Sequence, residues 1–528
     1  MNSTWNNNLA AFKSRFPQLA EIYKDSIVSL GKALETGDIP PFWQVKPSKT
    51  GDITATENGL VLHSTYNPVR EAAGAVAQAE VEAKGTTVFF GFGLGYHIIE
   101  WAKKYGTSDK KLVVIEPDAA HFFASLSLLD WSQVFKVEQL IIALACPAEN
   151  ILGLIEDQSK VNIGNTGVSD AFFFKIPAFT AHAQNYFDTI NTIIERNIQK
   201  NKINEATLKK FGKLWCRNSV NNIKQLANCS FIFSLKNKTE FPFLIIGAGP
   251  SLQKIIPVLN ELKKRMIVVC VETALHTLLE NHIEPDFIIL LDPQYWAYKH
   301  IAGLSSPSSV LITEVSAYPS VFRFNCQQIL LCGSQFPIGQ YFEKKLNIQP
   351  GDLGTGGSVA SSAWNFGKYC GAKEIYVAGL DLSFPGKQTH IRGSSAEQTF
   401  HKLSYKIKTA EKYGISSLFS ANAQPGVNYL NQSVLTDSRM KMFAWWFESR
   451  IAACPEVKTY TLCPESLKIP GIKIAAINDI LNKPEITKEN FFANIKQSTV
   501  DKTILAELQI NFPTEEFLNE SPFLKPYL

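Results

Sequence analysis

The sequence predicts an α/β protein with Rossmann-like, doubly wound, mainly parallel sheets in an N-terminal and a central domain, plus a helical C-terminal region. Two observations lead to this prediction. Apolar runs of strand length alternate with amphipathic stretches of helix length, first over residues 86–165 and again over residues 243–463. The strand-length runs are apolar on both faces, which is typical of buried parallel strands. A chain of 528 residues also has room for about three domains.

The N-terminal domain is expected over residues 1–190. Its first 40 residues have helical apolar spacing, and strand-like runs follow at WQVKPS and GLVLHS. The next segment, TTVFFGFGLGYHIIEWAKKYGTSDKKLVVIEPD, has the order strand, glycine turn, helix, strand of one parallel βαβ unit. Residues 182–228 contain no internal proline and predict long helices, so residues 191–235 are expected to form a helical connector.

The central domain is expected over residues 236–475. It opens with the strand FLIIGAG and a helix, SLQKIIPVLNELKKR, that Ser251 would cap. Further strands are MIVVCVE, DFIILLD, SSVLITEVS, QILLCGS, EIYVAGLDL and VKTYTLC. Helices are expected at TALHTLLENHI, at GSVASSAWNFGKYCG and near Ser433–Ala453. Residues 476–528 are charged and are expected to form the helical C-terminal region.

Composition argues against several classes of protein. A net charge of +4 gives little support for a nucleic-acid partner, and no apolar stretch reaches the ~18 residues needed for a membrane span. The nine cysteines show no CxxC pattern and no paired spacing near histidines, so no metal site is expected. The first residues lack the basic-then-apolar layout of a secretory signal. We therefore expect a cytoplasmic protein.

The turn Gly247–Leu252 follows the first strand of the central domain. In open parallel sheets, ligands bind beyond the carboxyl ends of the strands, where helix N-termini offer free N–H groups. Gly247 and Gly249 would let the backbone approach an anion, Pro250 suits a helix start, and Ser251 can cap. The turn lacks the third glycine of GxGxxG and the Gly-Lys-Ser/Thr of a Walker loop. A tight turn without a ligand explains the same residues.

A second glycine-rich turn, GDLGTGGSVASSAW, leads into another helix. Thr355, Gly356, Gly357 and Ser358 lie where that helix is expected to begin. Two such turns in one sheet could hold two parts of one anionic ligand. The pair therefore favours a binding site over two turns without a ligand.

Acidic residues end three of the predicted strands. Glu272 ends MIVVCVE, Asp292 ends DFIILLD, and Asp381 follows YVAGL. Carboxylates in this position bind ribose hydroxyls in dinucleotide folds. Capping of the next helix is the alternative explanation, and the sequence leaves both open.

The N-terminal turn GFGLGYH, Gly91–His97, resembles a methyltransferase turn. Glu116, 21 residues after Gly95, stands where an acidic residue would hold the ribose of S-adenosylmethionine. The GxGxG pattern is a weak signal, and nothing after Glu116 has the pattern of a methyl-transfer site. We therefore expect this domain not to be a methyltransferase. We expect it to be structural or to bind the acceptor substrate of the protein's reaction.

Taken together, several stretches resemble the Maf (motility-associated factor) flagellin glycosylation family. They are GLVLHSTYNPVREA, GFGLGYH, GAGPSL, EPDFIILLDPQ, GTGGSVASSAWNFGKYCGAKEIYVAGLDLSF and HIRG, within residues 55–475. The central domain is also similar to bacterial sialyltransferases that use a CMP-sugar. Their GxGPSL turn, KEIY-x-x-G-x-D strand and Cys-Pro-x-Ser segment occur here in the same order.

The chain departs from that sialyltransferase pattern at four positions. The asparagine of the first turn is Ala248, and the asparagines that usually end the next two strands are Glu272 and Asp292. The histidine expected before the last long helix is Gln432. An amide has no titratable proton near neutrality, so another residue must act as the base.

The resemblance implies a glycosyltransferase that moves a nonulosonic acid, similar to pseudaminic or legionaminic acid, from a CMP-sugar to Ser or Thr of flagellin. It implies no required cofactor beyond the CMP-activated donor. His390 and Asp381 are the catalytic candidates, because a histidine with a pKa of ~6.5 suits a general base. Lys387 and Arg392 flank His390 and could bind phosphate or the sugar carboxylate. The substrate-binding candidates are Gly247, Gly249, Pro250, Ser251, Glu272, Asp292, Gln294, Thr355, Gly356, Gly357, Ser358, Lys387 and Arg392.

Two other functions remain open from the sequence. A pterin diphosphokinase-like phosphotransferase shares the central domain and would need ATP, Mg²⁺ and carboxylates such as Asp292 and Asp381 as ligands. A non-catalytic flagellin-binding accessory protein would explain Gln432 in place of the histidine.

Overall fold

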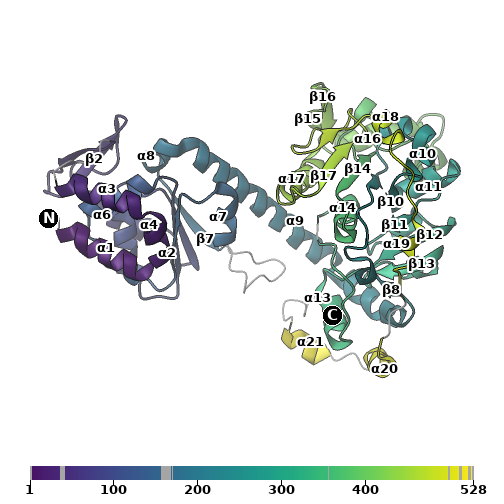
Figure 1. Cartoon of the computed structure of the whole chain (residues 1–528), viewed down its shortest axis with the longest axis horizontal. Coiled ribbons are helices and arrows are strands. Elements are labelled where there is room, and N and C mark those ends of the chain that lie inside the picture. The colour runs from purple at the N-terminus through teal and green to yellow at the C-terminus, as the bar shows by residue number, and fades with distance from the viewer. Residues whose placement is uncertain are drawn as a thin grey trace. The chain divides into compact units, whose positions relative to one another are not determined.

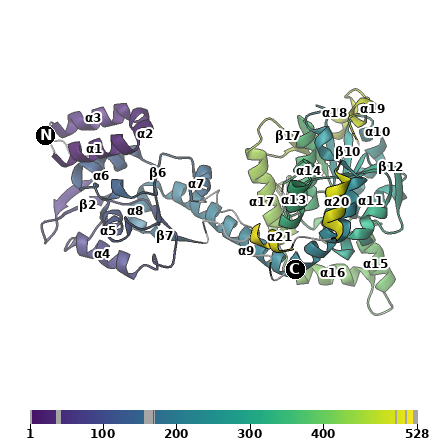
Figure 2. The ribbon, with the colours of Figure 1, turned by 90° about the horizontal axis from the view of Figure 1, so that it is seen from below.

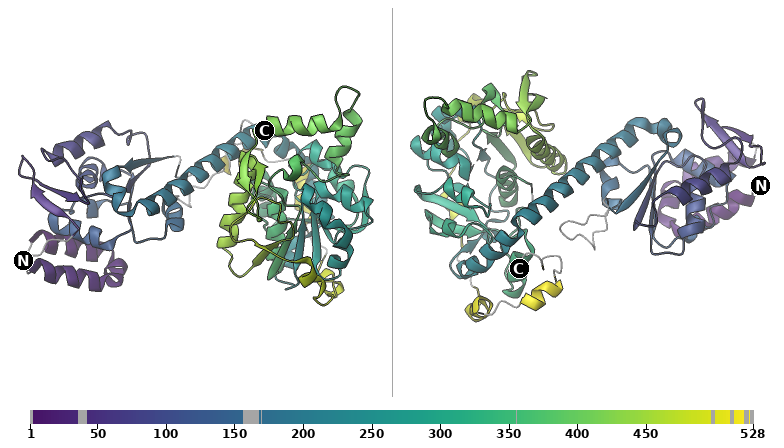
Figure 3. Two further views of the ribbon diagram at one scale, coloured as in Figure 1. Left: turned by 90° about the horizontal axis from the view of Figure 1, so that it is seen from above. Right: turned by 180° about the vertical axis from the view of Figure 1, so that it is seen from behind.

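A computed structural model gives the fold of the chain. It describes residues 3–35, 42–155, 168, 170–354, 356–496, 500–510, 514–520 and 525, without the side chains of 200, 201, 203–205, 208, 510 and 520. The chain forms two compact units, Met1–Leu208 and Lys209–Leu528. The predicted fold class is confirmed, because each unit is built on a parallel sheet covered by helices (Figures 1 and 3).

The N-terminal unit contains a four-stranded parallel sheet in the order β6-β5-β4-β7. The strands are β4 (Thr86–Phe90), β5 (Lys111–Glu116), β6 (Leu140–Leu144) and β7 (Ala171–Lys175). Their β-branched and aromatic residues are almost all buried, as parallel strands require. The chain moves outward from β4 to β6 and then returns to the other side of β4, so the sheet has a switch point between β4 and β7.

Helices and a small antiparallel sheet complete this unit. Figure 2 shows α1, α2 and α3 at one edge of this unit; α2 packs on α1 and α3, and α1 and α3 pack on α6. The antiparallel sheet consists of β1 (Gln44–Pro47), β2 (Ile53–Glu57) and β3 (Leu60–Val61). The helices are α1 (Ser3–Arg15), α2 (Pro17–Ile22), α3 (Lys24–Glu35), α4 (Pro68–Gln78), α5 (Tyr96–Tyr105), α6 (Ala119–Leu128), α7 (Ala148–Ile155), α8 (Pro177–Thr180) and the 3-10 turn η3 (Ala181–Ala183).

A 39-residue helix, α9 (Gln184–Asn222), covers most of the stretch expected to be helical, and the boundary between the two units lies inside it. Its last turns belong to the second unit. The buried amide of Asn218 donates to the carbonyl oxygens of Pro293 (2.9 Å) and Ser316 (3.1 Å). Within the described residues, no helix is both long and apolar enough to cross a bilayer.

The second unit contains a nine-stranded, fully parallel sheet in the order β18-β17-β14-β9-β10-β11-β12-β13-β8. The strands are β8 (Ser230–Phe231), β9 (Phe243–Ile246), β10 (Ile267–Val271), β11 (Phe287–Ile289), β12 (Ser305–Thr313), β13 (Asn325–Leu331), β14 (Glu374–Ala378), β17 (Lys458–Thr461) and β18 (Lys473–Ile474). The chain runs from β9 outward to β13 and then restarts beside β9 with β14. The switch point therefore lies between β9 and β14, where doubly wound sheets bind ligands.

The helices of this unit are mostly short. They are α10 (Leu259–Lys263), α11 (Glu272–Glu280), α12 (Tyr295–Lys299), α13 (Pro337–Lys345), α14 (Val359–Cys370), α15 (Ser395–Leu403), α16 (Ala410–Ser420), α17 (Ser438–Ala452), α18 (Ile477–Leu481), α19 (Glu489–Phe492), α20 (Lys502–Ile510) and α21 (Thr514–Glu520). An antiparallel hairpin, β15 (Gln424–Val427) and β16 (Ser433–Thr436), precedes α17.

Two predicted helices differ from the structure. The helix expected from Ser251 begins as 3-10 turns, η6 (Pro250–Lys254) and η7 (Ile256–Val258), and only then becomes the short α10. Gly249, not Ser251, is the first flanking residue, and Pro257 interrupts a regular α-helix because it has no N–H to donate. The long helix expected near Ser433–Ala453 begins only at Ser438, because residues 433–436 pair as a strand.

The region after residue 475 packs on the second unit. Phe491 of α19 is 2% exposed and belongs to the same core as Phe243 and Phe287, with ring centroids 6.3 and 6.1 Å apart. Lys488 forms a buried ion pair with Asp286. These contacts make the residues around α19 part of the core of the sheet.

Candidate functional site

The first glycine turn packs directly against the turn that follows β14. The N–H of Gly247 donates to Ala378 O (2.8 Å), and the N–H of Gly249 donates to Gly379 O (2.9 Å). A Cβ on Gly247 would lie 2.5 Å from Gly379 O, and one on Gly249 would lie 2.7 Å from the same atom. The glycines therefore allow the backbone segments that follow β9 and β14 to approach each other closely at the switch point. The amides expected to bind an anion at these two residues are engaged within the protein.

Asp381 secures this junction. Its carboxylate accepts hydrogen bonds from the N–H of Ser251 (3.0 Å) and from the Ser251 hydroxyl, so Ser251 does not cap a helix with its side chain. Asp381 is 3% exposed, and burial raises its pKa to about 6. Cys463 lies beside it and accepts from the N–H of Gly379 (3.4 Å). The three motifs that carry the sialyltransferase resemblance thus meet at the ends of β9, β14 and β17.

The second glycine turn begins α14 as expected. Ser358 is the N-cap, and its hydroxyl accepts from the N–H of Ser361 (3.3 Å). Gly357 has a φ of +74°, and a Cβ on Gly356 would lie 1.9 Å from Ser361 Oγ and 2.8 Å from the Trp446 ring of α17. The start of α14 and its packing against α17 therefore require these glycines. Thr355 lies outside the described residues.

Carboxyl groups follow three neighbouring strands: Glu272 is buried, and Asp292 and Glu314 are half-buried. Glu272 follows β10, is 6% exposed, and has one carboxyl oxygen without a hydrogen-bond partner. Burial raises its pKa to about 8, with a smaller contribution from the charge of Asp292. Glu314 follows β12, and burial raises its pKa to about 7. Because β10, β11 and β12 are adjacent, the three acids form a row along the carboxyl edge of the sheet, which we call the acid row.

Asp292 is the middle member of the acid row. Its two oxygens accept from the N–H (2.8 Å) and the side-chain amide (3.2 Å) of Gln294. The next residues, Tyr295 and Trp296, begin α12 and are 45% and 68% exposed. The predicted residues Asp292 and Gln294 are thus brought together, beside two exposed aromatic rings.

His390 lies close to a second histidine and an arginine. Burial, His300 and Arg439 lower its pKa to about 4, and its Nδ1 is buried without a hydrogen-bond partner. The Nδ1 of His300 pairs with the Ser395 hydroxyl, while the charge of Asp292 partly offsets the lowering of the His300 pKa by burial. The pKa of His390 therefore lies below the ~6.5 of an unperturbed histidine, and this side chain is neutral at neutral pH.

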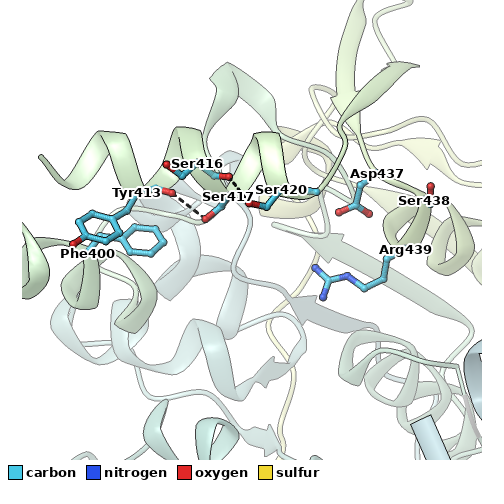
Figure 4. Close-up of a pocket in the computed structure, with 9 residues that line it drawn as sticks. Phe400, Tyr413, Ser416, Ser417, Ser420, Asp437, Ser438 and Arg439 are labelled. Atoms are coloured by element: carbon cyan, nitrogen blue, oxygen red, sulfur yellow. Dashed lines mark hydrogen bonds between the residues drawn. The ribbon is translucent and has the colours of Figure 1, made fainter. Parts of the chain in front are cut away.

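An open pocket of about 630 Å³ lies along α16 and at the start of α17. Figure 4 shows Phe400 and Tyr413 at one end, Asp437 and Arg439 at the other, and the serines of α16 between them. The two rings are stacked, with centroids 5.8 Å apart. Asp437 caps α17 through the N–H of Met440 (2.7 Å). The pocket lining is completed by Ser416, Ser417, Ser420, Ala421 and Ser438.

The remaining predicted residues lie on exposed loops. Lys387 and Arg392 are exposed on the two sides of His390. Gln432 is exposed in the turn between β15 and β16, where its N–H donates to Asn428 Oδ1 (2.8 Å). In this structure Gln432 therefore stabilises the hairpin turn.

The sequence-based candidates did not include His300, Glu314 or Arg439, nor the other residues that line the pocket. Glu314 follows a strand-length apolar run, as Glu272 and Asp292 do, so the same rule would have found it. His300 and Arg439 stand in no local motif, and only the fold brings them to His390.

The N-terminal glycine turn also packs against residues of its own unit. A Cβ on Gly93 would lie 2.7 Å from His63 Nε2, which accepts the N–H of Leu94 (2.9 Å). Glu116, the residue considered for ribose binding, accepts hydrogen bonds from His182 Nε2 (2.8 Å) and the N–H of Asp118 (3.0 Å). That carboxylate is therefore engaged in a network of its own.

Two family models match the chain. Residues 44–139 match the glycosyltransferase Maf N-terminal domain, and residues 217–387 match the 6-hydroxymethylpterin diphosphokinase MptE-like family. The first match covers β1 to the 3-10 turn η1 (Val134–Lys136) of the N-terminal unit, and the second covers β8 to β14 of the sheet.

Similar proteins include uncharacterized proteins of Treponema pallidum (strain Nichols). One is 35% identical over 219 residues, which cover 36% of this chain and 56% of that protein. A second is 30% identical over 262 residues, which cover 49% of this chain and 85% of that protein. The chain therefore spans little more than half the length of the first relative.

A solved structure has the same fold. It is the structure of a Maf glycosyltransferase from Magnetospirillum magneticum AMB-1, which matches with a TM-score of 0.58 and 14% identity. The match covers 98% of this chain and 82% of the other. At this identity the comparison shows a shared fold and nothing about individual site residues.

Proposed function

Since this chain belongs to the Maf (motility-associated factor) family, we propose that it is a glycosyltransferase. Its donor is a CMP-activated nonulosonic acid, similar to pseudaminic or legionaminic acid, and its acceptor is a Ser or Thr hydroxyl of flagellin. The reaction takes place in the cytoplasm and needs no further cofactor. The carboxyl edge of the second unit's sheet, with the pocket beside it, is the catalytic site.

The observation that supports this proposal best is the arrangement of the pocket around Arg439. A stacked aromatic pair and a guanidinium lie at opposite ends, with hydroxyl groups between them. A nucleoside monophosphate has the same order of a ring, hydroxyls and an anion. The pocket volume of about 630 Å³ is within the range of small-ligand sites. In this arrangement Arg439 binds the phosphate with charge-assisted hydrogen bonds.

His390 is the proposed general base. In the transfer, the acceptor oxygen forms a bond to the anomeric carbon, the bond from that carbon to the CMP phosphate breaks, and the hydroxyl proton passes to His390. A neutral imidazole can accept that proton, but a pKa of about 4 makes His390 a weaker base than an ordinary histidine, whose pKa of ~6.5 is nearer the working pH. The same low pKa favours release of the proton to the departing phosphate afterwards.

The acid row has a role that suits a keto-acid sugar. With a pKa of about 8, Glu272 is largely protonated at neutral pH and can donate a hydrogen bond. A protonated carboxyl group is a partner for the carboxylate of the sugar, which an ionised acid would repel. Asp381, with both oxygens bound to Ser251, holds the junction of β9 and β14 in place for this site.

A pterin diphosphokinase-like phosphotransferase is the second candidate. The match over residues 217–387 supports it, and so does the acid row, because carboxylates are the ligands of Mg²⁺ in ATP-dependent enzymes. In that case Asp292, which lies between Glu272 and Glu314, would be the principal Mg²⁺ ligand.

Calorimetry separates the two candidate functions by comparing how tightly the protein binds CMP and how tightly it binds ATP with Mg²⁺. We expect CMP to bind and Arg439→Ala to weaken it by about 10- to 100-fold, the loss of one charge-assisted hydrogen bond. Arg323→Ala is the matched control, because Arg323 is exposed in the same unit and bonds only to Ser320 in the described contacts. Tight ATP binding that depends on Mg²⁺ and Asp292 would favour the phosphotransferase.

Transfer is then measured by intact mass of flagellin incubated with the CMP-sugar. General-base catalysis contributes about 10²–10⁴-fold, so His390→Ala should slow transfer by that factor and leave CMP affinity unchanged. Wild-type protein that binds flagellin but leaves its mass unchanged would indicate the non-catalytic accessory protein. Transfer at the wild-type rate by His390→Ala would exclude His390 as the base.

A further inference from the structure

A cluster of histidines and carboxylates lies in the N-terminal unit, where the proposed transfer has no use for it. Glu57 comes from β2, His121 from α6 and His182 from η3. One ligand atom from each of these side chains lies within 4.8 Å of the other two. We propose that this cluster binds a divalent transition-metal ion of the zinc class.

The nitrogen and oxygen atoms of the cluster already face one another. The Nε2 of His121 is 2.7 Å from Glu57 Oε1, and the Nε2 of His182 is 2.8 Å from Glu116 Oε1. The imidazole rings of His121 and His182 are stacked, with centroids 4.4 Å apart, and Phe42 stacks on His121 at 4.2 Å. The rings are therefore held in place before any ion binds.

Two buried carboxylates face the two imidazoles of the cluster. The side chains of Glu57, His121 and His182 are each 9% exposed, and that of Glu116 is 2% exposed. Asp118 adds a third carboxylate beside His121, but its side chain is 47% exposed to solvent. Buried charge is stable only when it is paired. A divalent cation pairs with both buried carboxylates and lets the two imidazoles remain uncharged.

The donor set is the one that zinc-class ions use in sites with an open position. Two imidazoles and one carboxylate are three protein ligands, and the fourth position is free for a water or a substrate oxygen. Glu116 lies beside His182 and can occupy that position or bind the water. Bonds of about 2.0–2.2 Å to zinc require only small side-chain shifts from the observed spacing.

Outer contacts support two of the three ligands, His121 and Glu57. The Nδ1 of His121 lies 3.0 Å from a carboxylate oxygen of Asp118, on the side of the ring opposite Nε2, as an ion-pair contact without hydrogen-bond geometry. The indole N–H of Trp43 donates to the second oxygen of Glu57 (3.2 Å). Such contacts fix the ring orientation and are found around bound metals in many proteins.

Hydrogen bonds hold the cluster together without an ion. The 2.7 and 2.8 Å separations are hydrogen-bond lengths, so protons lie between these atoms in the metal-free protein. A metal must displace those protons to bind.

Zinc binding by the full-length chain, stripped with a chelator and dialysed, tests the proposal. We expect one zinc per chain, visible absorption when cobalt is bound in its place, and a higher melting temperature with zinc. His182→Gln and the isosteric Glu57→Gln should each weaken zinc binding by at least about 100-fold. His401→Gln is the matched control, because His401 is exposed on α15 and lies far from the cluster in sequence.

The variants are compared by their melting temperatures without zinc, so that loss of folding is not mistaken for loss of a ligand. If His182→Gln is unstable, Glu57→Gln gives the same test. Zinc should then raise the melting temperature of the wild type but not that of Glu57→Gln. Wild-type protein without stoichiometric zinc, or His182→Gln and Glu57→Gln with wild-type affinity, would overturn the proposal. The result does not depend on the glycosyltransferase proposal, because it concerns the other unit.

Discussion

Buried carboxyl groups are the most informative single residues of the second unit. Burial raises the pKa of Asp381 to about 6, of Glu314 to about 7 and of Glu272 to about 8. A raised carboxyl pKa means that the folded state binds the proton more tightly than the unfolded chain does. Stability from such a group is fully present below its unfolded pKa and is lost as the pH rises through its folded pKa.

Asp381→Asn tests this effect for one residue. Its pKa rises from 3.8 to about 6, so the wild type should lose stability relative to the variant as the pH rises through that window. Two pKa units correspond to about 3 kcal/mol. Asparagine can still accept the N–H of Ser251, so the junction is kept. Urea unfolding of both proteins between pH 4 and pH 7 measures the difference.

A difference that stays constant over that range would mean that the folded protein does not raise the Asp381 pKa. Glu272 and Glu314 are present in both proteins, so their contribution cancels in the comparison.

At the scale of elements, the junction of β9 and β14 shows why a glycine pattern need not mark a ligand. Both turns need glycine because each backbone passes close to the other, at the switch point of the sheet. In the sequence this junction has the same appearance as an anion-binding turn. Only the position of β14 beside β9 decides between the two explanations.

Gly249→Ala should therefore destabilise the fold rather than only block a ligand. Its Cβ would lie 2.5 Å from the Asp381 carboxyl carbon and 2.7 Å from Gly379 O. Overpacking of this kind typically costs about 1–3 kcal/mol. In Gly414→Ala, the added Cβ meets nothing within 4 Å. Because Gly414 lies within the helix α16, the substitution should leave the stability unchanged or increase it. Denaturant unfolding measures the stability of both variants. Equal stability of Gly249→Ala and Gly414→Ala would contradict the prediction.

At the scale of the whole molecule, the two units set the boundaries at which the chain can be divided. The second unit begins inside α9, and its first strand is β8. Asn222 is 1% exposed and donates to Val315 O (2.9 Å) and Ala317 O (2.7 Å). The domain boundaries at 190, 235 and 475 remain predictions, and these contacts indicate how to test them.

A fragment of residues 209–528 should fold cooperatively, because it keeps α9's buried asparagines, β8 and α19. A fragment of residues 236–475 lacks all three and should unfold at a lower temperature or not fold. Each lost buried asparagine leaves carbonyl groups unpaired, at about 1–3 kcal/mol each. Circular dichroism melting of the two fragments and the full chain provides the measurement. Equal melting temperatures would show that the shorter boundaries suffice.

The sequence by itself determined the alternation of strands and helices, both parallel sheets and the strand ends at which the acids lie. These depend on local apolar patterns and on the rule that parallel strands end at one edge. Tertiary structure alone decided which turns meet, that His390 is neutral, and that Glu57, His121 and His182 face one another from distant parts of the chain. The physical reason is that pKa values, close backbone approach and ligand geometry depend on neighbours in space, and no local pattern encodes those neighbours.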